Sequence, residues 1–142
     1  MLENRKSIWD AECTLKDAYL VTASALANVD SSAKIFDTGG GFTEGVLDLY
    51  ASAVSAASAT AHYVVSLQGS ASSTFATPTV ELATIELGNL SAVKGSRAVG
   101  TGSYKLRWSN MFGSTVYRYL RIYTTVTGTV TTGINYTAQL TK

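Results

Sequence analysis

The sequence predicts an all-β protein, folded as an antiparallel jelly-roll-like β-sandwich of about eight strands. Three observations support this fold class. Candidate strands recur at intervals of about ten residues, glycine-rich breaks separate several of them, and no helical segments alternate with the strands. With 142 residues the chain is long enough to bury a core of its own. Only 15% of the residues are charged, which is low for a globular domain and suits a sandwich or a protein packed against a large partner.

The expected elements follow a charged N-terminal stretch. Residues 1–17, which include Trp9, are interpreted as a short N-terminal arm, and residues 18–142 as the jelly-roll β-sandwich domain. The segments predicted as strands are 18–27, 33–37, 46–53, 61–68, 79–87, 92–98, 103–108, 117–125 and 134–140. The breaks TGGG, LQGS and VGTGS between them have the composition of turns.

Alternation within the strands predicts which side chains face the core. In 61–68 every second residue is large and apolar, and in 103–108 aromatic or aliphatic residues alternate with Lys105 and Arg107. These cations are therefore expected on the outside. The segment 46–61 also fits helical spacing, but a strand, a loop of small residues and a second strand are favoured because β patterns flank it on both sides.

The charges are unevenly distributed along the chain. The formal net charge is +1, yet all ten acidic residues precede residue 92. Every charged residue after that position is basic. This pattern can indicate a basic binding patch, or acidic and basic strands that pair within a sheet or between subunits. The second interpretation is favoured because the strands of a sandwich interleave. A net charge this small argues against a general nucleic-acid-binding protein.

The sequence predicts neither membrane insertion nor secretion. No segment reaches the roughly 18–20 apolar residues of a membrane span. Residues 18–27, AYLVTASALA, resemble a signal-peptide core, but acidic side chains precede them where a basic region is required. Cys13 is the only cysteine, so an intramolecular disulfide is excluded.

No constellation of catalytic residues is evident. His62 is the only histidine and is expected on the polar face of its strand, where a surface role is favoured over that of a base or metal ligand. Cys13 lies near Glu12 and Asp17, whose charges disfavour a reactive thiolate. No phosphate-binding glycine loop is present. The sequence therefore predicts a non-enzymatic protein without catalytic residues, a metal site or a cofactor.

One motif invites an enzymatic interpretation. In AKIFDTGGGF, two apolar residues precede Asp37-Thr38-Gly39, which resembles the active-site loop of dimeric aspartic proteases, where two carboxylates share one proton. However, Gly40 stands where that motif usually has a small side chain, and no convincing partner loop follows. We favour a β-turn in which Asp37 caps the backbone and the glycines adopt positive φ. A dimeric protease that uses Asp37 remains an alternative.

The strand at 117–125 has one face suited to a core and one suited to binding. Tyr119, Arg121 and Tyr123 lie on the second face. Aromatic rings beside cations can stack nucleic-acid bases, but tyrosine and arginine are also enriched at protein–protein interfaces. With only two arginines in this strand and a small net charge, a protein partner or neighbouring strand is favoured.

Large aromatic side chains also predict self-association. Trp9, Tyr50 and Tyr119 are difficult to bury together in one sandwich of this size, and exposed apolar patches mark interfaces. A homodimer is expected, with a trimer as the alternative. The predicted partner-binding residues are Trp9, Tyr119, Arg121 and Tyr123.

The C-terminal segment YRYLRIYTTVTGTVTTGINYTAQL resembles the closing signature of a family of tailed-bacteriophage capsid cement proteins. These proteins commonly end in an aromatic-leucine-arginine strand, a Thr-Val-Thr-Gly turn, and a Thr-Gly turn that leads into a Thr-Ala strand. The matching positions are Tyr119–Arg121, Thr125–Gly128, Thr132–Gly133 and Thr137–Ala138. Weaker similarity in LVTASALANVDSSAKIFDTGG and YVVSLQGSASSTF extends the resemblance over most of residues 15–141.

The resemblance implies a small jelly-roll protein of the virion. Such a protein is made in the host cytoplasm, binds the outer surface of the capsid, and cements neighbouring copies of the major capsid protein. The expected partners are the major capsid protein and further copies of this chain, with no nucleic acid and no membrane. A domain of a phage tail or fibre, or one that adheres to the host, would have the same β-rich composition and is the leading alternative.

Overall fold

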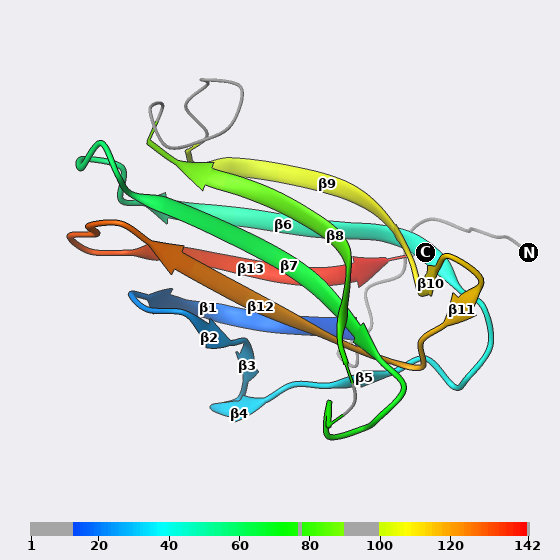
Figure 1. Cartoon of the computed structure of the whole chain (residues 1–142). Coiled ribbons are helices and arrows are strands. Elements are labelled where there is room, and N and C mark those ends of the chain that lie inside the picture. Colours follow the sequence, from blue (N-terminus) through cyan, green and yellow to red (C-terminus); the bar gives the residue numbers. More distant parts are fainter. Residues whose placement is uncertain (1–12, 77, 90–99, 142) are drawn as a thin grey trace, which may run out of the picture.

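A computed structural model describes residues 13–76, 78–89 and 100–141, which form two packed antiparallel sheets and two small hairpins (Figure 1). Sheet A has the order β1 (Thr14–Val21), β13 (Ile134–Thr141), β6 (Glu44–Val54), β9 (Gly102–Ser109). Sheet B has the order β2 (Ala25–Leu26), β12 (Tyr119–Thr127), β7 (His62–Ser70), β8 (Val80–Gly88), and β5 (Phe36–Asp37) also pairs with β12. The hairpins are β3 (Asn28–Val29) with β4 (Ser32–Ala33), and β10 (Met111–Phe112) with β11 (Thr115–Val116).

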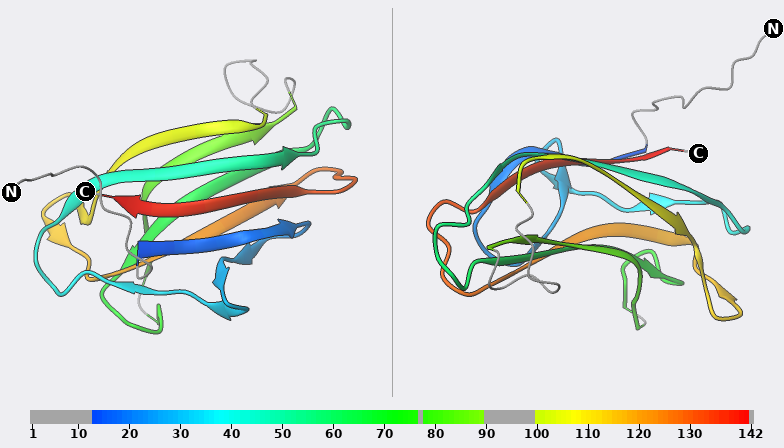
Figure 2. Two further views of the ribbon diagram at one scale, coloured as in Figure 1. Left: turned by 180° about the vertical axis from the view of Figure 1, so that it is seen from behind. Right: turned by 90° about the horizontal axis from the view of Figure 1, so that it is seen from above.

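The connections between the sheets are those of a jelly roll. The chain passes from sheet A to sheet B after β1, after β6 and after β9, and it returns after β5, after β8 and after β12. The last two strands enter the middle of the sheets: β12 lies between β2 and β7, and β13 lies between β1 and β6. Figure 2 shows the two layers that result. The predicted all-β antiparallel sandwich is therefore confirmed.

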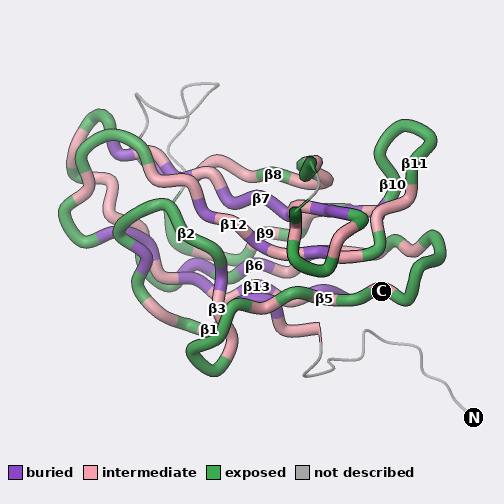
Figure 3. Tube along the Cα trace, turned by 60° about the horizontal axis from the view of Figure 1, so that its bottom comes forward, coloured by how far each residue is buried: buried purple, intermediate pink, exposed green. Residues whose placement is uncertain are grey.

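The core fills the space between the two layers, as the alternation in the sequence predicted. Tyr63, Val65 and Leu67 of β7 are fully buried and share a contiguous apolar cluster with the inward side chains of sheet A. On β9, Trp108 is buried while Lys105 and Arg107 are exposed. In Figure 3, buried and less buried positions alternate along β12 and β13.

Several predicted boundaries are wrong because the chain changes sheets within the predicted segment. Segment 18–27 contains the end of β1 and the whole of β2, which belong to opposite sheets, and residues 22–24 connect them. Segment 33–37 is likewise divided between β4 and β5. β1 begins at Thr14, so residues 14–17 belong to the sandwich rather than to the arm. The predicted strand 92–98 and residues 1–12 lie outside the described residues.

Ion pairs between described residues join the acidic and basic halves of the chain. Lys105 on β9 pairs with Asp48 on β6, and Arg118 pairs with Asp37 on β5. Each pair connects an acid from the first half of the sequence with a base from the second. The interpretation that acidic and basic strands lie side by side is confirmed for these pairs.

Sheet A contains a buried lysine ammonium. Lys16 is fully buried, and its Nζ donates hydrogen bonds to the carbonyl oxygens of Asp17 at 3.0 Å, Tyr19 at 3.1 Å and Tyr136 at 2.8 Å. The same Nζ lies 3.7 Å and 4.2 Å from the ring centroids of Tyr19 and Tyr136. An irregularity in the β1–β13 register between Lys16 and Tyr19 places all three residues at this point.

The two tyrosines and their surroundings set the electrostatics of this cluster. Burial lowers the pKa of Lys16 to about 8, and the Asp17 carboxylate opposes this shift. Burial also raises the pKa of Tyr136, whose hydroxyl shares a hydrogen bond with Thr124 of β12. Because β13 and β12 belong to different sheets, this bond connects the two layers above the ammonium.

Candidate protein-binding site

The outer face of sheet B carries the three tyrosine and arginine side chains that the sequence singled out. Tyr119, Arg121 and Tyr123 alternate on β12 with the buried Leu120 and Ile122, and all three are partly exposed. Their placement on one outward face is as predicted. With Gln68 of β7 and Phe75 of the β7–β8 loop they form the surface that we call the Arg121 face.

Arg121 is held in place by two neighbours. Its Nε donates a hydrogen bond to Gln68 Oε1 at 2.8 Å, and its Cζ lies 4.1 Å from the centroid of the Phe75 ring. Gln68 stands directly opposite Arg121 in the β7–β12 register. A guanidinium that stacks on a ring and bonds through one edge is fixed in direction, so it loses little conformational freedom when it binds a partner.

Phe75 reaches this position through an unusual backbone conformation. Its φ is +55°, which bulky side chains rarely adopt. The turn is stabilised by Ser72, whose carbonyl accepts a hydrogen bond from Phe75 N at 3.0 Å and whose Oγ accepts one from Thr74 N at 3.2 Å. Strain of this kind is retained at sites where a side chain must be aimed. Here the turn aims the ring at Arg121.

Sequence reasoning missed Gln68 and Phe75. Gln68 is one of the polar residues that alternate with apolar ones in the predicted strand 61–68, and nothing in the sequence distinguishes it from the others. Phe75 is the single aromatic residue in the small-residue loop GSASSTFATP, and this was the one available signal. Its contact with Arg121 depends on how the loop folds back over sheet B, which no local pattern encodes.

The electrostatic environment leaves Arg121 able to accept an anionic partner. Burial lowers the pKa of Arg121, and the nearby Tyr123 opposes the shift. An arginine in this setting can bind a carboxylate of its own chain or of a neighbour, and among the described residues its hydrogen-bond partner is the neutral Gln68. The outer guanidinium nitrogens form no hydrogen bond within the described part of the chain, so a carboxylate of another protein could bind there in bidentate geometry.

The Asp37 motif lies next to this face and forms a turn. Asp37 Oδ1 accepts hydrogen bonds from Gly39 N at 2.8 Å and from Arg118 Nε at 2.7 Å, and Oδ2 accepts one from Arg118 Nη2 at 3.0 Å. Gly39 and Gly40 have φ of +91° and +101°. The predicted capping and positive φ are therefore confirmed. The Arg118 guanidinium, followed by the Gly39 N–H, holds the pKa of Asp37 below its usual value.

Asp37→Asn should leave the fold intact and lower the melting temperature only slightly, because the Asp37–Arg118 pair is open to solvent. We expect no peptidase activity in either protein. Differential scanning fluorimetry and a quenched-peptide assay measure the two properties, with Asp48→Asn as the control for loss of another ion-paired carboxylate. A peptidase activity in the wild type that Asp37→Asn abolishes would contradict the turn-only role.

One end of the sandwich exposes apolar side chains on a rigid support. Phe42, Met111 and Phe112 are 54%, 40% and 56% exposed. The buried Asn110 connects their two segments: its Oδ1 accepts from Thr43 N at 2.9 Å, and its Nδ2 donates to the Gly41 carbonyl at 2.8 Å. Asn110 therefore fixes the loop before β6 against the start of the β10–β11 hairpin.

The remaining candidate residues show structural roles or lie outside the description. His62 is on the outer face of sheet B, as predicted, with Nε2 3.0 Å from Glu86 Oε1 and Nδ1 3.3 Å from Thr127 Oγ1. Tyr50 is 54% exposed, in line with its expected difficulty of burial. Trp9 lies outside the described residues. Within 13–76, 78–89 and 100–141, no three His, Cys, Asp or Glu residues are grouped as metal ligands. No helix in these same ranges has the length and apolar character for crossing a bilayer.

Comparisons with known proteins give no family assignment. No protein-family model matches the sequence, and no curated protein sequence matches it. The fold and the Arg121 face are therefore the features that bear on function.

Proposed function

We propose that this protein is a non-enzymatic structural component of a tailed-phage virion, which binds the outer surface of the capsid and cements neighbouring major capsid proteins. The observation that carries the proposal is the Arg121 face, a partly buried guanidinium positioned by Gln68 and Phe75 on the outer surface of a rigid sheet. Self-association as a homodimer, with a trimer as the alternative, is part of the proposal. The capsid surface supplies the carboxylate.

Three further features support a binding role. Arginine and tyrosine are the residues that most often dominate the energetics of protein interfaces, and both are present on this face. Apart from Phe75, the residues of this face lie on regular strands, which position side chains more accurately than loops do. The jelly-roll fold is the one that the resemblance to capsid cement proteins implies. The C-terminal signature of that resemblance includes Tyr119 and Arg121 themselves.

The location of the protein on the particle is the direct test. We expect it to co-purify with tailed virions through a density gradient, and gold-labelled antibody should decorate the outside of the capsid. Label on the tail or its fibres would instead favour a tail or host-adhesion domain. Absence from the particle would overturn the proposal.

Arg121→Ala should reduce occupancy on capsids without unfolding the protein. Truncating one side of a desolvated charged pair costs about 2 kcal/mol or more, equivalent to at least about thirtyfold in affinity, whereas an exposed pair costs less than about fivefold. Arg121→Lys should recover only part of the loss, because lysine cannot bind a carboxylate in bidentate geometry. Titration of depleted capsids with labelled protein measures the affinity.

Lys105→Ala is the matched control, since Lys105 is an exposed cation on the opposite sheet. Its occupancy should equal that of the wild type. Equal occupancy of Arg121→Ala and wild type would make the Arg121 face ordinary surface. Binding to single-stranded DNA that falls steeply with salt and weakens in Arg121→Ala would revive the nucleic-acid interpretation.

A further inference from the structure

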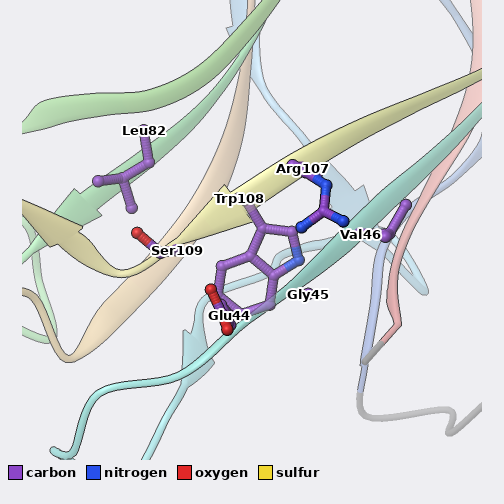
Figure 4. A pocket seen from close by; sticks show the side chains of 7 residues that line it. All are labelled: Glu44, Gly45, Val46, Leu82, Arg107, Trp108 and Ser109. Carbon is purple, nitrogen blue, oxygen red and sulfur yellow. The ribbon is translucent and has the colours of Figure 1, made fainter.

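A pocket of about 640 Å³ opens at one end of the sandwich, away from the Arg121 face. It is lined by the beginning of β6, the end of β9, and one residue of β8. The lining residues are Glu44, Gly45, Val46, Leu82, Arg107, Trp108 and Ser109. Figure 4 shows the Trp108 indole among them, with the Glu44 carboxylate and the Arg107 guanidinium on different sides.

Trp108 has an unsatisfied polar atom in this pocket. The residue is 5% exposed, and its indole Nε1 is buried with no hydrogen-bond acceptor among the described residues. Buried indole N–H groups usually have a partner, because leaving one unpaired is costly. Gly45, which has no side chain, stands opposite Trp108 in the β6–β9 register and lines the same pocket. The pocket therefore lacks an acceptor that another segment can supply.

Of the two longer segments outside the described residues, 1–12 and 90–99, only the first joins the described chain at the end of the sandwich that holds this pocket. The β9 end that carries Trp108 is level with the start of β6, the end of β13 and the start of β1. Residues 1–12 therefore join the sandwich at this end, through Cys13. Residues 90–99 connect the opposite ends of β8 and β9, where Gly88 pairs with His62 and Gly102 with Ala51.

The chain between Trp9 and β1 is long enough to span the distance from β1 to the pocket. β1 and β9 are separated by three strand spacings, or about 14 Å. Trp9 precedes Cys13 by four residues, and four extended residues also span about 14 Å. Trp9 can therefore reach β9 by crossing the ends of β13 and β6, and its long side chain covers the offset along the strands.

The charges of the segment and of the pocket are complementary. The pocket carries one acid and one base, Glu44 and Arg107, which are both exposed. Trp9 is preceded by Lys6 and followed by Asp10. A segment that crosses the pocket can place each charge beside its opposite, which favours this segment over a purely apolar partner.

We propose that residues 1–12 dock into this pocket on their own molecule, with the Trp9 side chain inside it and a backbone carbonyl beside Trp9 accepting the Trp108 indole N–H. The docked segment lies beside β9, which is the last strand of sheet A among the described residues. This proposal is independent of the proposed function. It gives Trp9 a role within the chain instead of the contact with a partner that the sequence suggested.

The indole resonances of the full-length protein test the docking. The chain has two tryptophans, so the indole region of a ¹⁵N-labelled sample contains two signals, which Trp9→Ala reduces to one. We expect Trp9→Ala to shift the Trp108 signal and to speed its hydrogen exchange about tenfold or more, because the acceptor is lost. Leu2→Ala, a matched truncation in the same segment, should change neither the position of the Trp108 signal nor its rate of hydrogen exchange. An unchanged Trp108 signal in Trp9→Ala would overturn the proposal.

A spin label distinguishes docking within one molecule from docking between copies. Ser7→Cys in a Cys13→Ser background provides one attachment site for a nitroxide, and Cys13→Ser alone is the control. We expect the nitroxide to broaden the Trp108 indole signal of the molecule that carries it. Broadening of the Trp108 signal of unlabelled ¹⁵N-enriched protein, when labelled unenriched protein is mixed with it, would overturn docking on the same molecule. Absence of broadening in both samples would overturn docking itself.

Discussion

Replacing Lys16 with methionine should lower the free energy of unfolding by about 3 kcal/mol at neutral pH. The substitution leaves the carbonyls of Asp17, Tyr19 and Tyr136 without their shared donor, and each unpaired buried acceptor costs about 1–3 kcal/mol. The two tyrosine rings also lose their cation. Relief of a buried charge offsets part of this loss. Urea denaturation monitored by circular dichroism measures the change, with the exposed Lys105→Met as the control.

The same variant should alter the dependence of stability on pH. Because the folded protein holds the pKa of Lys16 at about 8, against about 10.4 in the unfolded chain, the unfolded state binds more protons between these values. Stability must then rise with pH in this window, by about 2 kcal/mol between pH 8 and pH 10. Above pH 10 the trend should reverse, since burial raises the pKa of Tyr136 and the unfolded phenol ionises first.

The pH profile of Lys16→Met provides the decisive comparison. All other ionisable groups are present in both proteins, so the difference between the two profiles reports mainly on Lys16. We expect the rise between pH 8 and pH 10 to be absent from the variant. Parallel profiles would show that the ammonium is as well stabilised in the fold as in water, by its carbonyls and rings.

Gly128→Ala should destabilise the protein by about 4 kcal/mol or more, through a steric clash added to backbone strain. Gly128 has φ of +78°, and a Cβ at this position would lie 1.8 Å from the carbonyl oxygen of Thr60 and 2.5 Å from its carbonyl carbon. Both neighbours are backbone atoms, so a side-chain rotation cannot relieve the contact. Thermal unfolding followed by circular dichroism measures the loss.

Gly113→Ala separates the two causes. Gly113 also has a positive φ, +64°, but no atom lies within 4 Å of the position that its Cβ would occupy. This variant should therefore show only the conformational penalty of about 1–2 kcal/mol. Similar losses in Gly113→Ala and Gly128→Ala would mean that the turn around Gly128 relaxes away from Thr60.

The fold class was predictable because alternation is a local property of each strand. Leu120, Ile122 and their outward neighbours could be assigned to faces by counting residues. The point where a strand leaves one sheet for the other was not predictable in this way. Residues 22–24, Thr-Ala-Ser, contain no glycine or proline to mark a turn, yet they end β1 and carry the chain across to β2.

The contacts that define the candidate site depend on the tertiary structure. Arg121 could be placed on an outward face, but its stacking on Phe75 requires a turn with positive φ forty-six residues earlier in the chain. Lys16 was assigned to a charged arm, because no sequence pattern shows that a register irregularity turns its side chain inward. Each of these cations has a partner far away in the sequence, Phe75 for Arg121 and Tyr136 for Lys16.

The residues that carried the family resemblance also have direct structural reasons. Gly128 and Gly133 both adopt positive φ, and a Cβ on either would meet a backbone carbonyl oxygen, of Thr60 or of Val21. These two glycines are thus required by the turns between β12 and β13. The tyrosine and arginine positions of β12 lie on the outer face, where the fold imposes fewer constraints, and they are the part of the signature that bears on a partner.

The central position of β13 has a consequence for how the protein is made. β1 can acquire its neighbour in sheet A only when residues 134–141 have been synthesised, because β13 lies between β1 and β6. The contact between Lys16 and Tyr136 spans 120 residues of chain. On the ribosome, the apolar faces of the early strands therefore stay uncovered until residues 134–141 emerge, and folding should be slow. Chaperone demand during synthesis is expected to be high relative to a helical protein of this length.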